Sequence, residues 1–175
     1  MPRPRSILLS GPVGSGKTTL LLEIGELLER TDKPYALVDA DWLAWLRPAP
    51  GESLAVDDVL VENLRAVWTT FRRVGVRRLV VARFLQRSEQ ANAIRHALDD
   101  LDLFVVRLAV PKQELNKRLR ERDSGRELAE HLALIDDSVT VAFEDAVVDA
   151  GGGRPPSEIA VEILTLASWL STRSR

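Results

Sequence analysis

Five short apolar runs alternate along the chain with stretches in which apolar residues recur every three to four positions. The apolar runs are typical of buried strands, and the periodic stretches are typical of amphipathic helices. The predicted strands span residues 6–10, 35–39, 78–82, 103–108 and 146–149. The predicted helices span residues 17–30, 55–74, 88–100, 111–121, 127–143 and 157–171. This alternation predicts a mostly parallel sheet with helices on both faces, and ligands at the carboxyl ends of its strands.

The turn between the first predicted strand and the first helix carries the most specific motif. Residues 11–18 read Gly-Pro-Val-Gly-Ser-Gly-Lys-Thr and fill every fixed position of a phosphate-binding loop. The glycines let consecutive N–H groups face an anion at a helix N-terminus, Lys17 can reach the outer phosphates, and the Thr18 hydroxyl can hold Mg²⁺. The predicted nucleotide-binding residues of this segment are Gly11, Gly14, Ser15, Gly16, Lys17, Thr18 and Thr19.

Two carboxylates follow the second predicted strand, in the segment Val-Asp-Ala-Asp-Trp. Transfer of a phosphoryl group to a hydroxyl needs a carboxylate that accepts the proton and oxygen ligands around Mg²⁺. Asp41 lies farther from the strand and is the preferred base, while Asp39 would complete the metal sphere. The alternative is that acidic residues merely end a strand.

An arginine-rich segment lies near residues 118–130 and predicts a mobile lid over the phosphates. Arg118 and Arg122 are four residues apart on one helix face, and Gly125 would end the helix and begin a turn that carries Arg126. Arg122 and Arg126 would neutralise the charge of the transferring group. The alternative is a solvated helix face on which Arg122 pairs with neighbouring carboxylates.

The end of the third predicted strand carries an apolar or a basic residue where many P-loop ATPases have an acidic residue that binds Mg²⁺ through water. The position falls on Ala82 or Arg83, which disfavours a strongly hydrolytic motor-type ATPase. Arg83 and Gln86 are therefore candidate contacts for the acceptor, with loop solubility as the alternative. His96 and His131 have no metal-like partners nearby in the sequence, and surface roles are expected for both.

Aromatic residues past the two carboxylates could form one wall of an acceptor pocket. Trp42, Trp45 and Asn63 are the candidates for this role. The competing interpretation places the tryptophans, Trp68 among them, in the hydrophobic core, which is the commoner place for this residue type.

Composition limits the remaining choices. A chain of 175 residues with 45% hydrophobic and 29% charged residues suits one domain, residues 1–175, and contains no cysteine for disulfides or thiolate metal sites. The formal net charge of -2 disfavours broad nucleic-acid binding. No apolar run approaches the ~20 residues of a membrane span, and the one near the N-terminus is too short for a secretory signal, so a cytoplasmic location is expected.

Together, the loop at residues 11–18, the Asp39 and Asp41 pair, the arginine segment and the ending at residues 147–149 resemble the small P-loop kinases. This group includes nucleoside monophosphate, shikimate, gluconate, adenylylsulfate and chloramphenicol kinases. The resemblance implies a three-layer P-loop fold with strand order 2-3-1-4-5. It also implies that residues 151–155, including Gly151 and Arg154, border the adenine, that Arg118 flanks the base, and that Arg122 and Arg126 serve the lid.

The function expected from these features is ATP-dependent and Mg²⁺-dependent transfer of a phosphoryl group to a hydroxyl of a small molecule. A monophosphate acceptor would call for several arginines after the second strand, but that stretch offers Trp42, Trp45 and a lone Arg47. A hydroxylated, partly apolar acceptor is therefore favoured. The alternatives are a regulatory nucleotide-binding protein or slow ATPase, and a nucleic-acid end kinase, which would need a basic track.

Overall fold

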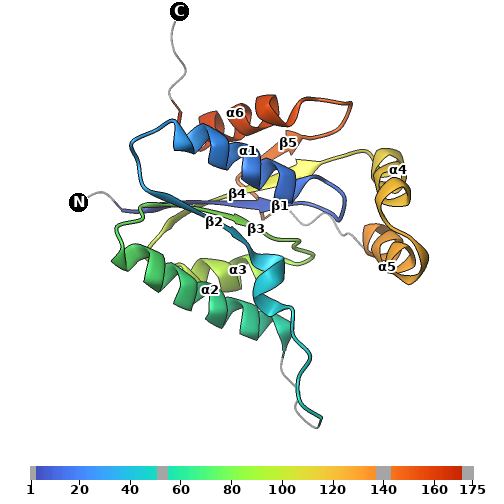
Figure 1. Cartoon of the computed structure of the whole chain (residues 1–175), viewed down its shortest axis with the longest axis horizontal. Helices are drawn as coiled ribbons and strands as arrows, with labels where there is room; N and C mark the ends of the chain where they lie inside the picture. The colour runs from blue at the N-terminus through green and yellow to red at the C-terminus, as the bar shows by residue number, and fades with distance from the viewer. Residues whose placement is uncertain (1–2, 51–54, 137–142, 171–175) are drawn as a thin grey trace, which may run out of the picture.

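The sheet of this protein contains five parallel strands in the order β2-β3-β1-β4-β5 (Figure 1). A computed structural model describes residues 3–50, 55–136 and 143–170 of the chain. The strands are β1 (Arg5–Ser10), β2 (Tyr35–Asp39), β3 (Arg78–Ala82), β4 (Asp102–Ala109) and β5 (Ala146–Asp149). The predicted fold class and strand order are therefore confirmed.

The central position of β1 follows from its sequence. Ile7, Leu8 and Leu9 are fully buried, and Ile7 lies beside Val80 of β3 on one side and beside Phe104 of β4 on the other. A strand covered on both faces needs apolar residues at consecutive positions rather than at alternate ones. This arrangement directs the loop that follows β1 to the carboxyl edge of the sheet.

Helices cover both faces of the sheet (Figure 1). On one face lie α1 (Lys17–Glu29) and α6 (Pro156–Leu166), and on the other lie α2 (Val56–Arg73) and α3 (Ser88–Ala97). Each face has its own apolar core. A third pair, α4 (Lys112–Arg122) and α5 (Gly125–Asp136), projects beyond the carboxyl ends of the strands.

Several predicted boundaries need correction. A short 3-10 helix, η1 (Ala40–Ala44), follows β2 because the Asp39 carboxylate accepts the Asp41 N–H at 3.2 Å and starts a tight turn. The fifth helix begins at Gly125 instead of residue 127, and residues 137–142 of its predicted range lie outside the described residues. The last helix ends at Leu166. None of the helices in the described part of the chain is long and apolar enough to cross a membrane.

Candidate active site

The P-loop, residues 11–18, joins β1 to α1 at the carboxyl edge of the sheet. Gly14 and Gly16 adopt φ values of +82° and +93°, a left-handed region that strains residues with a Cβ atom. Since α1 begins at Lys17, the N–H groups of its first turn have no carbonyl partner within the helix and are available to an anion. The Ser15 hydroxyl is buried in the loop and makes no hydrogen bond to any described residue. These features fit the phosphate groups of a nucleotide.

The Lys17 side chain is folded back into the loop. Its Nζ donates to the carbonyl oxygens of Gly11 and Pro12 at 3.0 and 3.1 Å and lies 5.7 Å from the centre of the Phe84 ring. Burial lowers the pKa of Lys17 to about 8, although Asp41 and Asp39 oppose this shift. Negative charge delivered by a triphosphate would favour the ammonium form again.

Thr18 and Asp39 bring two oxygen donors together at the start of α1. The Thr18 hydroxyl donates to Asp39 Oδ2 at 2.8 Å. Hydroxyl and carboxylate oxygens are ligands that Mg²⁺ accepts, so the donor set fits this ion. These are the two residues that the sequence analysis expects to hold Mg²⁺, and that role stays a prediction.

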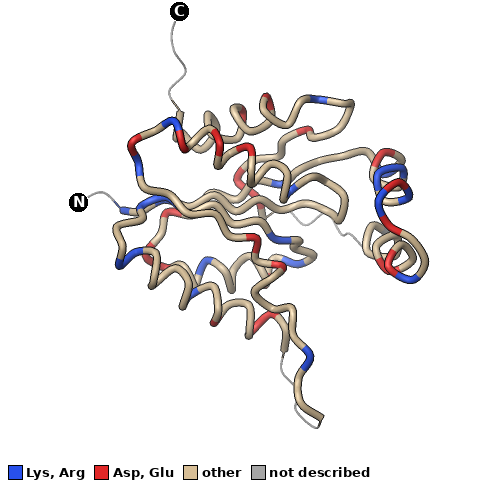
Figure 2. The backbone as a smooth tube through the Cα atoms, in the orientation of Figure 1, with Lys and Arg blue, Asp and Glu red and all other residues tan. Residues whose placement is uncertain are grey.

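A cavity of about 620 Å³ opens between the P-loop, the end of β3 and the α4–α5 pair. The predicted site residues that line it are Gly14, Gly16, Lys17, Thr18, Thr19, Asp41, Arg83, Arg118 and Arg122. The lining therefore carries four cationic side chains and one carboxylate. Figure 2 shows basic residues on α4 and after β3, on either side of this region. The Lys17 ammonium group, which has no carboxylate partner among the described residues, and the N–H groups at the start of α1 favour an anionic ligand.

Asp41 lines the cavity and is held by Arg83. The distance from Arg83 Nη1 to Asp41 Oδ1 is 2.6 Å, and Arg83 Nη2 also lies 3.3 Å from Asp57 Oδ1. Arg83 thus links the η1 turn to the first turn of α2. No sequence pattern singles out Asp57, because its partners are at least 26 residues away.

Of the three predicted arginines of the α4–α5 pair, two reach the cavity. Arg118 donates to the Gly14 carbonyl at 3.3 Å and to the Ala150 carbonyl at 3.0 Å, and so ties α4 to the P-loop and to the end of β5. Arg122 lines the cavity and donates to Asp123. Arg126 lies within α5 instead of in the expected turn, pairs with Glu130 at 2.6 Å, and its side chain is 92% exposed.

The segment expected to border the adenine is held by local contacts. Gly151 packs so closely that an added Cβ atom would lie 2.6 Å from Pro111 Cδ. Arg154 donates to the Asp149 carbonyl at 2.6 Å and to Glu162 at 2.7 Å, so it fastens the loop to α6 and does not line the cavity. The geometry brings neither Gly151 nor Arg154 into the wall of the cavity.

The aromatic residues divide between surface and core. Trp42 and Trp45 are 67% and 78% exposed and stack on each other, with ring centroids 5.0 Å apart, whereas Trp68 is buried and donates to Asp100. The core interpretation therefore holds for Trp68 and is wrong for the other two. Asn63 donates to the Leu43 carbonyl at 2.7 Å, which anchors η1 on α2.

Gln86 and Phe84 depart from the sequence analysis in opposite ways: the first was expected at the site and the second was not. Gln86 uses its backbone N–H to bond the Gln90 side chain at 2.8 Å and does not line the cavity. Phe84, which the sequence did not single out, lies between this cavity and a second one of about 430 Å³ that Gly11 also lines. In the sequence, Phe84 is marked only by its position directly after the candidate residue Arg83.

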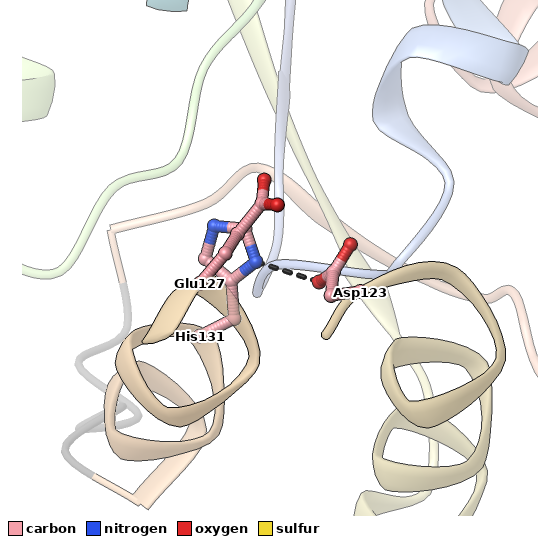
Figure 3. Close-up of side chains that lie close together, drawn as sticks. All are labelled: Asp123, Glu127 and His131. Atoms are coloured by element: carbon pink, nitrogen blue, oxygen red, sulfur yellow. Dashed lines mark hydrogen bonds and ion pairs between the residues drawn. The ribbon is translucent and has the colours of Figure 1, made fainter. Parts of the chain in front are cut away.

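His131 is the main correction to the sequence analysis. Its side chain lines the cavity, and its Nδ1 lies 2.7 Å from Asp123 Oδ2 (Figure 3). The expectation of a surface role without metal-like partners is therefore wrong for His131, whose ligand atom lies within 4.8 Å of those of Asp123 and Glu127. The turn between α4 and α5 brings together two residues that eight sequence positions separate. His96 is exposed and contacts the Asn92 carbonyl, as a surface role would have it.

Comparison with known sequences gives one family match. A family model described as an AAA domain matches residues 7–142. No curated protein sequence matches the chain.

Solved structures show the same fold over nearly the whole chain. An APS kinase from Mycobacterium tuberculosis, in complex with AMPPNP and APS, is 22% identical with a TM-score of 0.67, over 96% of this chain and 99% of that chain. A gluconokinase from Sinorhizobium meliloti 1021 is 21% identical with a TM-score of 0.62, over 97% and 94%. A sugar kinase from Janibacter sp. HTCC2649 is 20% identical with a TM-score of 0.62, over 94% and 95%. The chain has the fold of the small P-loop kinases.

Proposed function

The chain belongs to the AAA domain family, and we propose that it is a kinase that transfers the γ-phosphoryl group of ATP to a hydroxyl of a small molecule. One observation carries the proposal: Lys17 and Thr18 share a single cavity with the Asp41 carboxylate. A carboxylate in the same cavity as the phosphate-binding residues can accept the proton of a hydroxyl, which phosphoryl transfer to an alcohol requires. The kinase folds of the APS kinase and the gluconokinase support the same conclusion.

Binding of the nucleotide falls to the P-loop. The N–H groups at the start of α1 would hold the β- and γ-phosphates, and Lys17 would exchange its two carbonyl partners for phosphate oxygens. Thr18 and Asp39 would hold Mg²⁺, which when bound neutralises phosphate charge. Arg118, fixed between the P-loop and β5, would flank the base.

Transfer requires a proton acceptor and charge compensation. Asp41 would accept the hydroxyl proton as the acceptor oxygen bonds to the γ-phosphorus and the bond to the β–γ bridging oxygen breaks, releasing ADP. The ion pair with Arg83 would keep the Asp41 carboxylate oriented toward the cavity. Arg122 would compensate the charge on the transferring group. The exposed faces of Trp42 and Trp45 would receive an apolar part of the acceptor.

The test is Asp41→Asn, studied with an acceptor found by measuring ADP release across nucleosides, sugars, polyols and antibiotics. We expect kcat to fall about 100-fold or more, because general-base catalysis contributes roughly 10²–10⁴-fold, while ATP affinity changes little. Asp58→Asn is the matched control, since Asp58 is an exposed carboxylate in the first turn of α2. Unchanged turnover in Asp41→Asn would refute the assignment of the base. Slow ATP turnover that no acceptor accelerates would instead favour the regulatory protein or slow ATPase.

A further inference from the structure

His131 is a cavity-lining residue that the proposed transfer does not use. It lies on α5, its side chain is 25% exposed, and it shares the cavity wall with Lys17 and Arg122. Its partner Asp123 follows the last residue of α4, and the Asp123 side chain is only 4% exposed. A buried carboxylate thus fixes an imidazole at the edge of the predicted phosphate site (Figure 3).

The contacts of Asp123 determine which imidazole nitrogen is free. Arg122 donates to both Asp123 oxygens, at 2.6 and 2.9 Å, and these bonds hold the pKa of the Asp123 carboxyl at about 2. An ionised carboxylate only accepts hydrogen bonds, so the Nδ1 of His131 must carry the proton that lies between them. Nε2 has no hydrogen-bond partner within the described ranges and is therefore left for a ligand.

The surrounding charges indicate which ligand this would be. Lys17 lines the same cavity and has no carboxylate partner among the described residues, whereas the three lining arginines, Arg83, Arg118 and Arg122, are each paired with a carboxylate. On the side of α5, Asp123 is already neutralised by Arg122, and Glu127, one turn before His131, is exposed. The cavity that the ring lines therefore holds the Lys17 ammonium group and the N–H groups at the start of α1, which attract an anion.

We propose that His131, oriented by Asp123, is a phosphate-binding residue that donates from Nε2 to an outer phosphate of the nucleotide. The proposal rests on the nucleotide site of the proposed kinase and adds a contact from α5 to those of the P-loop and Arg122. The contact forms with the protonated imidazole, whose Nε2 is a donor. Asp123 acts through this orientation and is a positioning residue.

A divalent cation is the competing ligand for the same side chains. One ligand atom from each of Asp123, Glu127 and His131 lies within 4.8 Å of the others, a spacing that would suit a metal ion. Both Asp123 oxygens, however, already accept hydrogen bonds from Arg122, so a metal would have to displace a guanidinium. The anion needs no such displacement, and the observations favour it.

The experiment compares wild type with His131→Gln in equilibrium binding of ATP, ADP and AMP, without an acceptor, between about pH 5.5 and 8.5, where imidazoles commonly titrate. We expect the variant to bind ATP about tenfold more weakly at the acid end of this range, the size of one charge-assisted hydrogen bond. The loss shrinks toward the alkaline end, and AMP, which lacks the outer phosphates, binds equally well to both proteins. A purely structural role would weaken all three nucleotides alike.

Glu127→Gln and a titration with Zn²⁺ alone separate the two ligands. Under our proposal Glu127→Gln keeps wild-type affinity for ATP within about twofold, because an exposed carboxylate beside the ring adds little. Zn²⁺ binding that both substitutions abolish, together with unchanged ATP affinity in His131→Gln, would overturn the proposal in favour of a metal site. Since the assay needs no acceptor, a chain that binds ATP but phosphorylates nothing would refute the kinase activity and leave this contact intact.

Discussion

Lys17 shows how the nucleotide site is built at a cost to stability. Its ammonium group is removed from water, its hydrogen bonds go to two carbonyl oxygens, and the charges of Asp41 and Asp39 compensate its burial only in part. Two hydrogen bonds to neutral acceptors do not replace the hydration of a charge, which is why burial lowers the pKa of this lysine. This unfavourable burial of a charge is present in the nucleotide-free protein, and a bound phosphate would compensate it.

We expect Lys17→Met to stabilise the protein at neutral pH while it abolishes tight ATP binding. The fall in the pKa of Lys17 from 10.5 to about 8 means that the buried ammonium group lowers the free energy of unfolding by about 3 kcal/mol. Because the substitution also removes two hydrogen bonds, we expect a net gain in the free energy of unfolding of about 1–2 kcal/mol. Between pH 8 and 10.5 the unfolded chain binds more protons than the folded one, so wild-type stability rises with pH and the advantage of the variant disappears.

Urea unfolding of both proteins at a series of pH values measures this difference. Lys117→Met is the matched control, because the Lys117 side chain is 75% exposed and its removal should change the free energy of unfolding by less than about 0.5 kcal/mol. A Lys17→Met protein less stable than wild type at pH 7 would contradict the account of the buried ammonium group.

Sequence reasoning succeeds for residues whose neighbours in space are neighbours in the motif. Lys17 and Thr18 could be placed at the start of the first helix and in the cavity wall, because the loop between a buried strand and a helix determines their surroundings locally. The pairing of Asp41 with Arg83 spans 42 positions, and that of His131 with Asp123 crosses a break between helices. No periodicity within one element aligns such residues, so their contacts had to come from the folded structure.

At the scale of secondary-structure elements, the sequence also predicts the α4–α5 pair only in part. Gly125 predicted a break in the chain, but the break comes at Asp123, and Gly125, with a φ of +57°, opens the next helix. Arg126 therefore faces solvent on a helix instead of moving with a flexible turn. The apolar contacts of α5 are few, with Ile135 buried and Leu128 and Leu132 only partly so.

Because so little apolar surface holds α5, we expect its amides to exchange hydrogen faster than those of α6, which buries Ile159, Ala160, Ile163 and Leu164. ATP should slow exchange in α5 by about tenfold or more, because Arg122 and His131 would then contact phosphate. Hydrogen exchange followed by mass spectrometry, with and without ATP, measures both effects. The α6 peptides are the internal control, and an α5 segment insensitive to ATP would contradict closure of the α4–α5 pair on the nucleotide.

At the scale of the whole molecule, one sheet connects two cores. Along β1, Ile7 and Leu9 face the core under α1 and α6, and Leu8 faces the core over α2 and α3. Because β1 supplies side chains to both cores, unfolding of one core would disturb the packing of the other. We therefore propose that the chain folds as one cooperative domain, even though its apolar clusters lie on opposite sides of the sheet.

Matched substitutions in the two cores test this cooperativity. Ile94 of α3 and Ile163 of α6 are both buried, each in a different core. Ile94→Val and Ile163→Val should each lower the free energy of unfolding by about 0.5–1.5 kcal/mol, and the double variant by the sum within about 0.5 kcal/mol, since the sites share no contacts. All variants should unfold in urea in one transition with the wild-type slope. A second transition in either variant would mean that each core can unfold while the sheet stays covered on its other face.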